Sequence, residues 1–181
     1  HEFSHAFLAN YLGDPTAKLQ GRLTLNPLAH LDPLGTLLML IAHFGWGKPV
    51  PVDPYNLRNP KRDSALISLA GPASNLILAV FLSILLRLIP LSIIYYLVSS
   101  IVIMSVSLAI FNLVPIHPLD GFAIILGILP EDLARQWEEL RGYGMIFLIL
   151  LIFPFGNGSL ITNLISPLIS LILDLLLPGL D

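Results

Sequence analysis

The sequence predicts an all-α, polytopic membrane protein that forms a single membrane-embedded domain over residues 1–181. Hydrophobic residues make up 55% of the chain and charged residues only 12%, against about 25% charged residues in an average soluble domain. Two apolar runs, residues 65–89 and 91–116, are long enough to cross a bilayer as helices. With the shorter apolar runs they predict a bundle of about five to six transmembrane or re-entrant helices.

The amino-acid composition also limits which metal ligands and which partners the protein can have. The chain has no cysteine, so disulfides and thiolate zinc sites are excluded, and any metal must be held by His, Asp or Glu. The net charge is only −3, and no basic stripe is interleaved with aromatic residues, so nucleic acid is not an expected partner. The partner that the composition implies is the lipid bilayer.

The first part of the chain is expected to hold short elements. Residues 1–12 predict the end of an apolar helix, terminated by the Gly-Asp-Pro that follows. Residues 19–25 suggest short strands and a turn, a small β-hairpin-like segment after the first helix. Residues 34–46 are apolar but too few to cross a bilayer, and predict a re-entrant or short buried helix. Residues 47–64 hold four prolines and four Lys or Arg, and predict a polar loop.

The second part is dominated by the spans. After residues 65–89 and 91–116 comes a charged connection at 130–142, expected to be a short surface helix, and then apolar segments at 143–155 and 160–177. Basic residues cluster before the first span and after the second (Lys48, Arg58, Lys61, Arg62; Arg135, Arg141). Two spans return the chain to the same side, which the positive-inside rule makes cytoplasmic.

The chain opens on an H-E-x-x-H pattern, formed by His1, Glu2 and His5. On a helix, positions i and i+4 share one face, so both imidazoles can reach one metal ion. Glu2 is adjacent and can act on a water held there. This is the pattern of zinc-dependent peptide hydrolysis. The alternative is a helix end with two polar histidines facing water, which the apolar residues around them disfavour.

A second stretch, NLVPIHPLDG at residues 112–121, follows an unbroken apolar span. An aspartate at membrane depth is costly and is by default functional. Two prolines break the helix there, and irregular backbone at such depth is tolerated where it is buried or lines a wet cavity. A metal held by Asp120 would offset both costs. The alternative is that Asp120 caps the next helix at the membrane surface.

Together these stretches resemble the site-2 protease family of intramembrane zinc metalloproteases, in particular its compact, bacterial-type members without a PDZ domain. The run LAGPASN at residues 69–75 is similar to the family's glycine-proline-asparagine signature. The runs GRLTLNPLAHLDPLGT and GKPVPVDPYNLRNPKRDSALISLAGP agree with it. The resemblance covers residues 1–130. The family pattern continues upstream of the histidine motif, so this chain is expected to be N-terminally truncated and to bind zinc weakly by itself.

The resemblance implies that His1, His5 and Asp120 hold Zn2+ and that Glu2 is the catalytic residue, taking the proton from a zinc-activated water. It implies an endopeptidase in a bacterial plasma membrane, with its active site nearer the cytoplasmic side and membrane-spanning proteins as substrates. Asn112 is expected to donate to the developing oxyanion or to hold the substrate.

Other functions stay open. Polar residues near broken helices, among them Asn75 and Asn112, would also suit the ion path of a membrane transporter, although this leaves the H-E-x-x-H pattern unexplained. A catalytically silent, membrane-binding relative is the other alternative. Both asparagines can instead make hydrogen bonds between helices. An edge strand at residues 22–25 is expected to pair with an unwound substrate.

Overall fold

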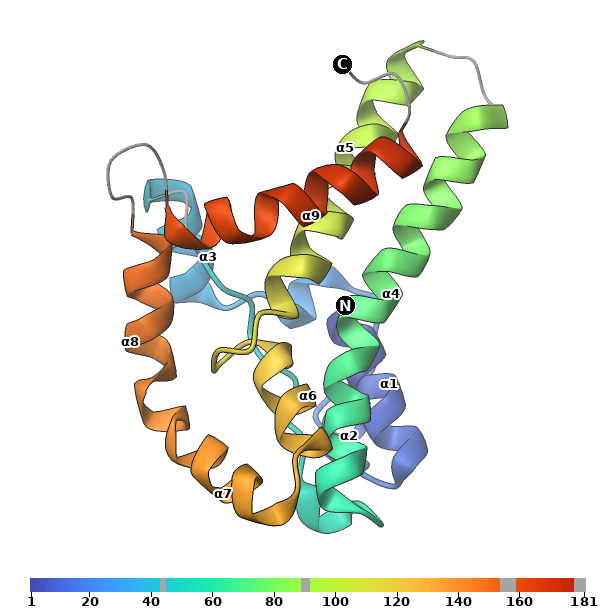
Figure 1. Ribbon diagram of the computed structural model, residues 1–181. Coiled ribbons are helices and arrows are strands. Elements are labelled where there is room, and N and C mark those ends of the chain that lie inside the picture. Colours follow the sequence, from blue (N-terminus) through green and yellow to red (C-terminus); the bar gives the residue numbers. More distant parts are fainter. Residues whose placement is uncertain (43–44, 89–91, 154–158, 178–181) are drawn as a thin grey trace. The chain divides into compact units, whose positions relative to one another are not determined.

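The computed structural model describes residues 1–42, 45–88, 92–153 and 159–177. The described chain is mainly helical (Figure 1), which confirms the predicted helical class. It divides into two compact units, His1–Gly71 and Pro72–Asp181. The boundary falls inside the 29-residue helix α4 (Pro60–Leu88). Each unit has a hydrophobic core of its own.

The first unit is built from short elements. They are α1 (Glu2–Leu12), α2 (Thr16–Leu19), the 3-10 helix η1 (Pro27–His30), α3 (Pro33–Ala42), the 3-10 helix η2 (Pro54–Asn56) and the first turns of α4. Helix α1 ends, as predicted, at Gly13, whose φ of 115° is left-handed and suits glycine. The core of this unit joins Ala9 of α1, Leu57, which follows η2, and Ile67 of α4.

The predicted β-hairpin is wrong. Leu19 ends helix α2 and residues 22–25 form no strand, and the isolated bridge found in the described part of the chain joins Leu31 to Gly47 instead. The side chain of Arg22 is buried and its Nη2 donates to the carbonyl oxygen of Lys48 at 2.5 Å. This tertiary contact turns the backbone inward where an exposed strand was expected. The edge strand proposed to pair with substrate is therefore absent at these residues.

The long helix α4 begins inside the segment predicted as a loop. Pro60 takes its first position, where the missing N–H costs no hydrogen bond. The backbone N–H of Asn59 donates to the Asp63 carboxylate at 2.9 Å, and the N–H of Asp63 donates to the Asn59 carbonyl at 2.8 Å. These local bonds start the helix before its apolar run begins.

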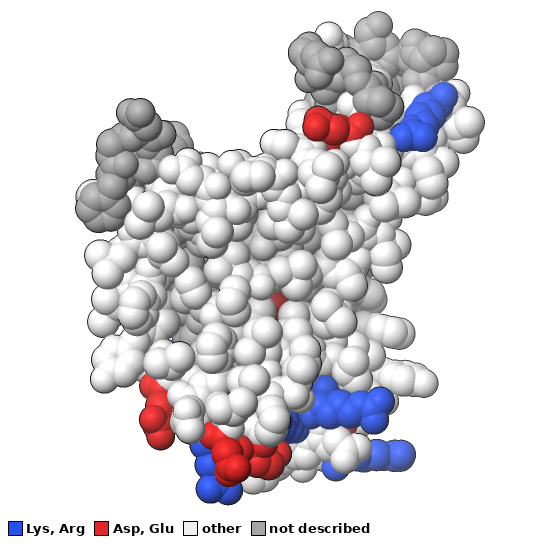
Figure 2. Space-filling model, in the orientation of Figure 1, with Lys and Arg blue, Asp and Glu red and all other residues white. Residues whose placement is uncertain are grey.

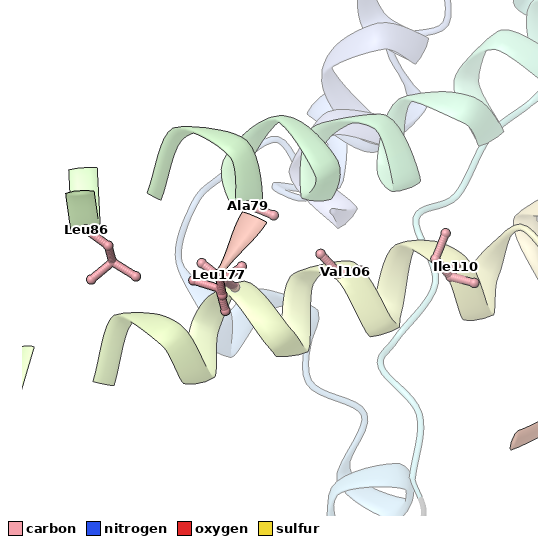
Figure 3. Packing of buried hydrophobic residues seen from close by; sticks show 6 residues of the cluster. Ala79, Leu86, Val106, Ile110 and Leu177 are labelled. Atoms are coloured by element: carbon pink, nitrogen blue, oxygen red, sulfur yellow. The ribbon is translucent and has the colours of Figure 1, made fainter. Parts of the chain in front are cut away.

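The second unit contains the rest of α4, followed by α5 (Ser92–Asn112), α6 (Asp120–Ile128), α7 (Glu131–Glu139), α8 (Arg141–Ile152) and α9 (Leu160–Leu176). Its main core joins α4, α5 and the end of α9, with Ala79, Val106, Ile110 and Leu177 among its members (Figure 3). Helix α9 lies across α5 (Figure 1). The hydroxyl of Ser83 donates to the carbonyl oxygen of Leu176, which ties the end of α9 to α4.

Helix α5 ends at Asn112 and not at residue 116 as predicted. The N–H of Leu113 still bonds to the carbonyl of Ala109 at 3.1 Å, but the N–H of Val114 bonds only three residues back, to Phe111. Pro115 has no N–H and disfavours helical backbone at the residue before it. The last turn therefore tightens and stops.

Two described helices, Pro60–Leu88 and Ile94–Asn112, are long and apolar enough to cross a membrane. The predicted total of about five to six transmembrane or re-entrant helices stays a prediction. Figure 2 shows a wide band where almost no charged side chain reaches the surface, between charged groups along α7 and others near the ends of α4 and α9. This distribution is the one expected of a helical unit surrounded by lipid.

Asp14 organises the first unit at the end of α1. Its fully buried carboxylate accepts hydrogen bonds from the N–H and hydroxyl of Thr16, the N–H of Asp53 and the amide of Asn56. Burial by itself would raise the pKa of the Asp14 carboxyl, but these bonds outweigh it and hold that pKa below its ordinary value of 3.8. The carboxylate thus joins the start of α2 to η2, across a long stretch of sequence.

We expect Asp14→Asn to lower the free energy of unfolding by about 1–3 kcal/mol, because an amide N–H would face a buried donor. The parent should also lose stability as the pH falls below about 4, since the unfolded chain then binds the proton first. The variant should lack this dependence. Thermal unfolding in detergent measures both. The exposed Asp132→Asn is the control, and a variant as stable and as pH-sensitive as the parent would contradict the role.

Candidate metal centre

The two histidines of the motif lie together at the start of α1. His1 is the residue before the first turn and His5 lies one turn further on. Their ring centroids are 4.7 Å apart with the ring planes at 86°, and a nitrogen of each ring lies within 4.8 Å of the other. Glu2 begins the first turn, three residues before His5 and so on a neighbouring face. The predicted pair of imidazoles is therefore placed to share one ion.

A carbonyl of α4 orients the second imidazole. His5 is buried, and its Nδ1 lies 2.7 Å from the carbonyl oxygen of Ile67. A carbonyl oxygen only accepts, so Nδ1 carries the hydrogen and donates it. In the neutral ring this leaves the lone pair on Nε2. A metal-binding histidine is held in this way, with the other ring nitrogen fixed by an outer partner that sets the tautomer.

Glycine at position 71 makes room for both rings. A methyl group at Gly71 would overlap Nε2 of His5, and would lie 2.5 Å from Cε1 of His5 and 2.7 Å from Cε1 of His1. Helix α4 can therefore pass beside the imidazoles only because this residue has no side chain. Gly71 belongs to the glycine-proline-asparagine signature in the sequence, but its packing against the two imidazoles was not predicted. The signal was an isolated glycine within an apolar helical run.

In the second unit, Asp120 is the first residue of α6 and is half-buried. The helix cap is Leu119, without a side-chain capping bond, so Asp120 lies within the first turn and does not cap the helix. The next residue, Gly121, packs against the carbonyls of Leu113 and Val114, where a methyl group would lie 2.5 Å from the Val114 oxygen. This close approach folds the broken segment after α5 back on itself and sets where α6 begins.

The two asparagines have different surroundings. Asn112 is the last residue of α5, and its Nδ2 donates to the carbonyl oxygen of Leu108 in the same helix at 2.9 Å. One of its two N–H groups is therefore engaged within α5. Asn75 is buried within α4. The oxyanion role suggested for Asn112 stays a prediction.

Contacts made by Phe122 hold α6 in place. Phe122 stacks on Trp137 of α7, with ring centroids 5.4 Å apart, and the indole Nε1 donates to the Phe122 carbonyl at 3.1 Å. The ring of His117 meets the same Phe122 edge-on at 5.6 Å, and Gly144 of α8 approaches the backbone of His117 closely. The segment that carries Asp120 is thus fixed by aromatic contacts of Phe122 and Trp137, which no sequence motif indicated.

A buried, oriented imidazole beside a second one, with a glutamate next to them on the same helix, is an arrangement that suits a metal-dependent hydrolase. A protein of Bacillus subtilis named "Putative zinc metalloprotease YwhC" is 40% identical over 168 residues, which are 87% of this chain and 77% of that protein. Proteins named "Putative zinc metalloprotease Rip2" from Mycolicibacterium smegmatis and Mycobacterium tuberculosis are 35% and 33% identical, and the chain covers 64% of their length. The chain belongs to the site-2 protease family of zinc metalloproteases. No family model and no solved structure matches it.

Gly71→Ala should reduce the affinity for zinc about tenfold or more, because the added methyl group displaces the imidazole of His5. The measurement is zinc bound per chain, by metal analysis and competition with a chelator. Gly142→Ala is the matched control, since a methyl group there meets nothing within 4 Å. Parental zinc affinity in Gly71→Ala would show that α4 does not constrain the ring.

Proposed function

We propose that this protein is an intramembrane zinc endopeptidase that cleaves membrane-anchored proteins. The observation that supports this most directly is the imidazole of His5, which is buried and oriented by the Ile67 carbonyl so that Nε2 carries the lone pair that can bind a cation. Family membership supplies the class of reaction. The apolar helices α4 and α5 support a site within or beside the bilayer.

We propose His1, His5 and Asp120 as the ligands of a zinc ion. Two imidazoles and one carboxylate are a ligand set of catalytic zinc, which leaves one position for water or substrate. The residues of the first unit fit the ion: both rings converge, one is held by an outer carbonyl, and Gly71 leaves space beside them. A bound zinc ion would act as a Lewis acid toward the scissile carbonyl and toward water.

Glu2 is proposed as the general base and acid. Its position in the first turn of α1 places it next to His1 and near His5 along the helix surface. It would accept a proton from the attacking water and later give a proton to the leaving amine. Proton transfer by a positioned group of this kind contributes about 10²–10⁴-fold to rate. Asn112 would hold the substrate backbone through the N–H of its amide that does not bond within α5.

Glu2→Gln should retain zinc and lose cleavage by about a hundredfold or more, because glutamine cannot take up the proton. The assay is cleavage of a model transmembrane substrate in detergent by the complete gene product, with zinc measured on the same samples. His5→Ala should lose both zinc and cleavage. Asn112→Leu should keep its zinc and lose cleavage only in part.

Three other outcomes of this assay would contradict the proposal, each in a different way. Zinc in the parent and in Glu2→Gln with equal cleavage would remove Glu2 from the mechanism. Zinc without cleavage in either protein would point to the catalytically silent relative. A parent that binds no zinc would point to the transporter.

We also propose that the protein is integral to a bacterial plasma membrane, with its site nearer the cytoplasmic side. Lys61 and Arg62 lie at the start of α4, and Arg141 follows α7, so both ends of the two-span segment carry positive charge. Positive charge near short spans is retained in the cytoplasm. The similar proteins named above come from bacteria, which supports a bacterial membrane.

The chain has no cysteine, so single cysteines can report this topology. Arg58→Cys and Glu139→Cys should react with a membrane-impermeant maleimide only after the inner membrane is opened. Leu88→Cys, exposed at the other end of α4, should react in intact spheroplasts. The reverse pattern would invert the proposed orientation.

A further inference from the structure

Arg22 is a buried cation with neutral partners. Its side chain is only 4% exposed, and its Nη2 donates to the Lys48 carbonyl oxygen and lies 3.4 Å from Nδ1 of His30. Its Nε and Nη1 are buried without a hydrogen-bond partner among the residues that the structure describes. A guanidinium keeps its charge at any physiological pH, and a buried charge without a counter-ion is strongly unfavourable. The site therefore favours an oxyanion.

Two residues contact the Arg22 guanidinium, His30 and Lys48. Nε2 of His30 lies 2.8 Å from the Thr24 carbonyl oxygen and donates to it, so the Nδ1 that faces Arg22 is an acceptor. Lys48 contacts Arg22 through its backbone carbonyl, and its exposed side chain adds a second positive charge to this part of the unit. We call Arg22, His30 and Lys48 the Arg22 cluster. A guanidinium beside an ammonium is suited to phosphate oxygens.

The Arg22 cluster lies at the base of an apolar segment. The bridge between Leu31 and Gly47, and the bond from the Lys48 N–H to the His30 carbonyl at 2.8 Å, close this segment on itself. Helix α3 lies within this closed segment and has 10 residues. Its length is therefore about 15 Å, which is half of the roughly 30 Å hydrocarbon core of a bilayer. Its exposed side chains are apolar: Leu34, Leu37, Met39, Leu40 and Ile41.

Trp46 lies at the foot of this segment and is 47% exposed. Tryptophan in such a place anchors at the level of lipid headgroups. Insertion of α3 into one leaflet would place its base and the Arg22 cluster at the level of the headgroup phosphates. Residues 46–49, which contact Arg22 through the Lys48 carbonyl, are exposed, so a headgroup would reach Arg22 by displacing them.

We propose that the Arg22 cluster is a binding site for the phosphate of a phospholipid headgroup. The phosphate would accept hydrogen bonds from Nε and Nη1 of Arg22, with the ammonium of Lys48 at the rim. The bound lipid would hold the base of the α3 segment at the membrane surface. This site is separate from the proposed zinc ligands and does not depend on proteolytic activity.

The test is lipid retention by the purified, delipidated protein, incubated with phosphatidylglycerol in detergent and weighed by native mass spectrometry. Arg22→Gln should lower the affinity for the lipid about tenfold or more, because it removes charged hydrogen bonds. Lys48→Glu keeps the backbone contact with Arg22 and should also weaken retention, which covers the case in which Arg22→Gln fails to fold. Lys18→Gln, another exposed lysine of this unit, is the matched control.

A second arm distinguishes the source of the phosphate. Inorganic phosphate replaces the lipid, and the thermal unfolding midpoint is recorded for the parent and for Arg22→Gln. Stabilisation by inorganic phosphate that needs Arg22, without lipid retention, would overturn the lipid proposal in favour of a free-phosphate site. Equal retention of phosphatidylglycerol by the parent, Arg22→Gln and Lys48→Glu would overturn the site itself.

Discussion

The hydrogen bond from Nδ1 of His5 to the Ile67 carbonyl oxygen is the contact around which the first unit is arranged. In an apolar interior each polar group needs a partner, and this bond satisfies one ring nitrogen and leaves the lone pair of the neutral ring on the other. It requires α1 and the start of α4 to lie close together. Ala6 and Ala9 are fully buried on α1, and Gly71 has no side chain to separate the helix from the rings. Small residues thus allow the hydrogen bond between His5 and Ile67 to form in an apolar interior.

In the second unit, Asp120 begins a helix directly after a stretch of irregular backbone. Pro115 ends α5, and Gly121 lets the chain fold back against carbonyls of the turn that it has just made. The Phe122–Trp137 stack and the indole hydrogen bond then fix α6 from the side of a charged surface helix. Asp120 is in this way held in place by a helix at the polar end of the unit.

Local structure could not be predicted from the sequence where residues far apart in the chain determine it. Residues 22–25 have a strand-like pattern, yet Arg22 turns inward to a carbonyl 26 residues away, and no hairpin forms there. Asp14 is joined to residues near 53–56 by bonds that nothing in the local sequence announces. By contrast, the long apolar helices, the glycine end of α1 and the charged surface helix were predicted, since periodicity and capping are local properties.

The sequence by itself determined the helical class, the family and the pair of histidines, because these follow from composition, from the spacing of one helical turn and from motifs that need no long-range information. Only the tertiary structure decided which imidazole nitrogen of His5 carries the hydrogen, why position 71 must be glycine, and that two nitrogens of Arg22 are buried without a hydrogen-bond partner among the described residues. Those features arise between residues far apart in the chain. Their physical cause is that each polar group in an apolar interior needs a hydrogen-bond or charge partner. Which residue supplies that partner is decided only when the chain folds.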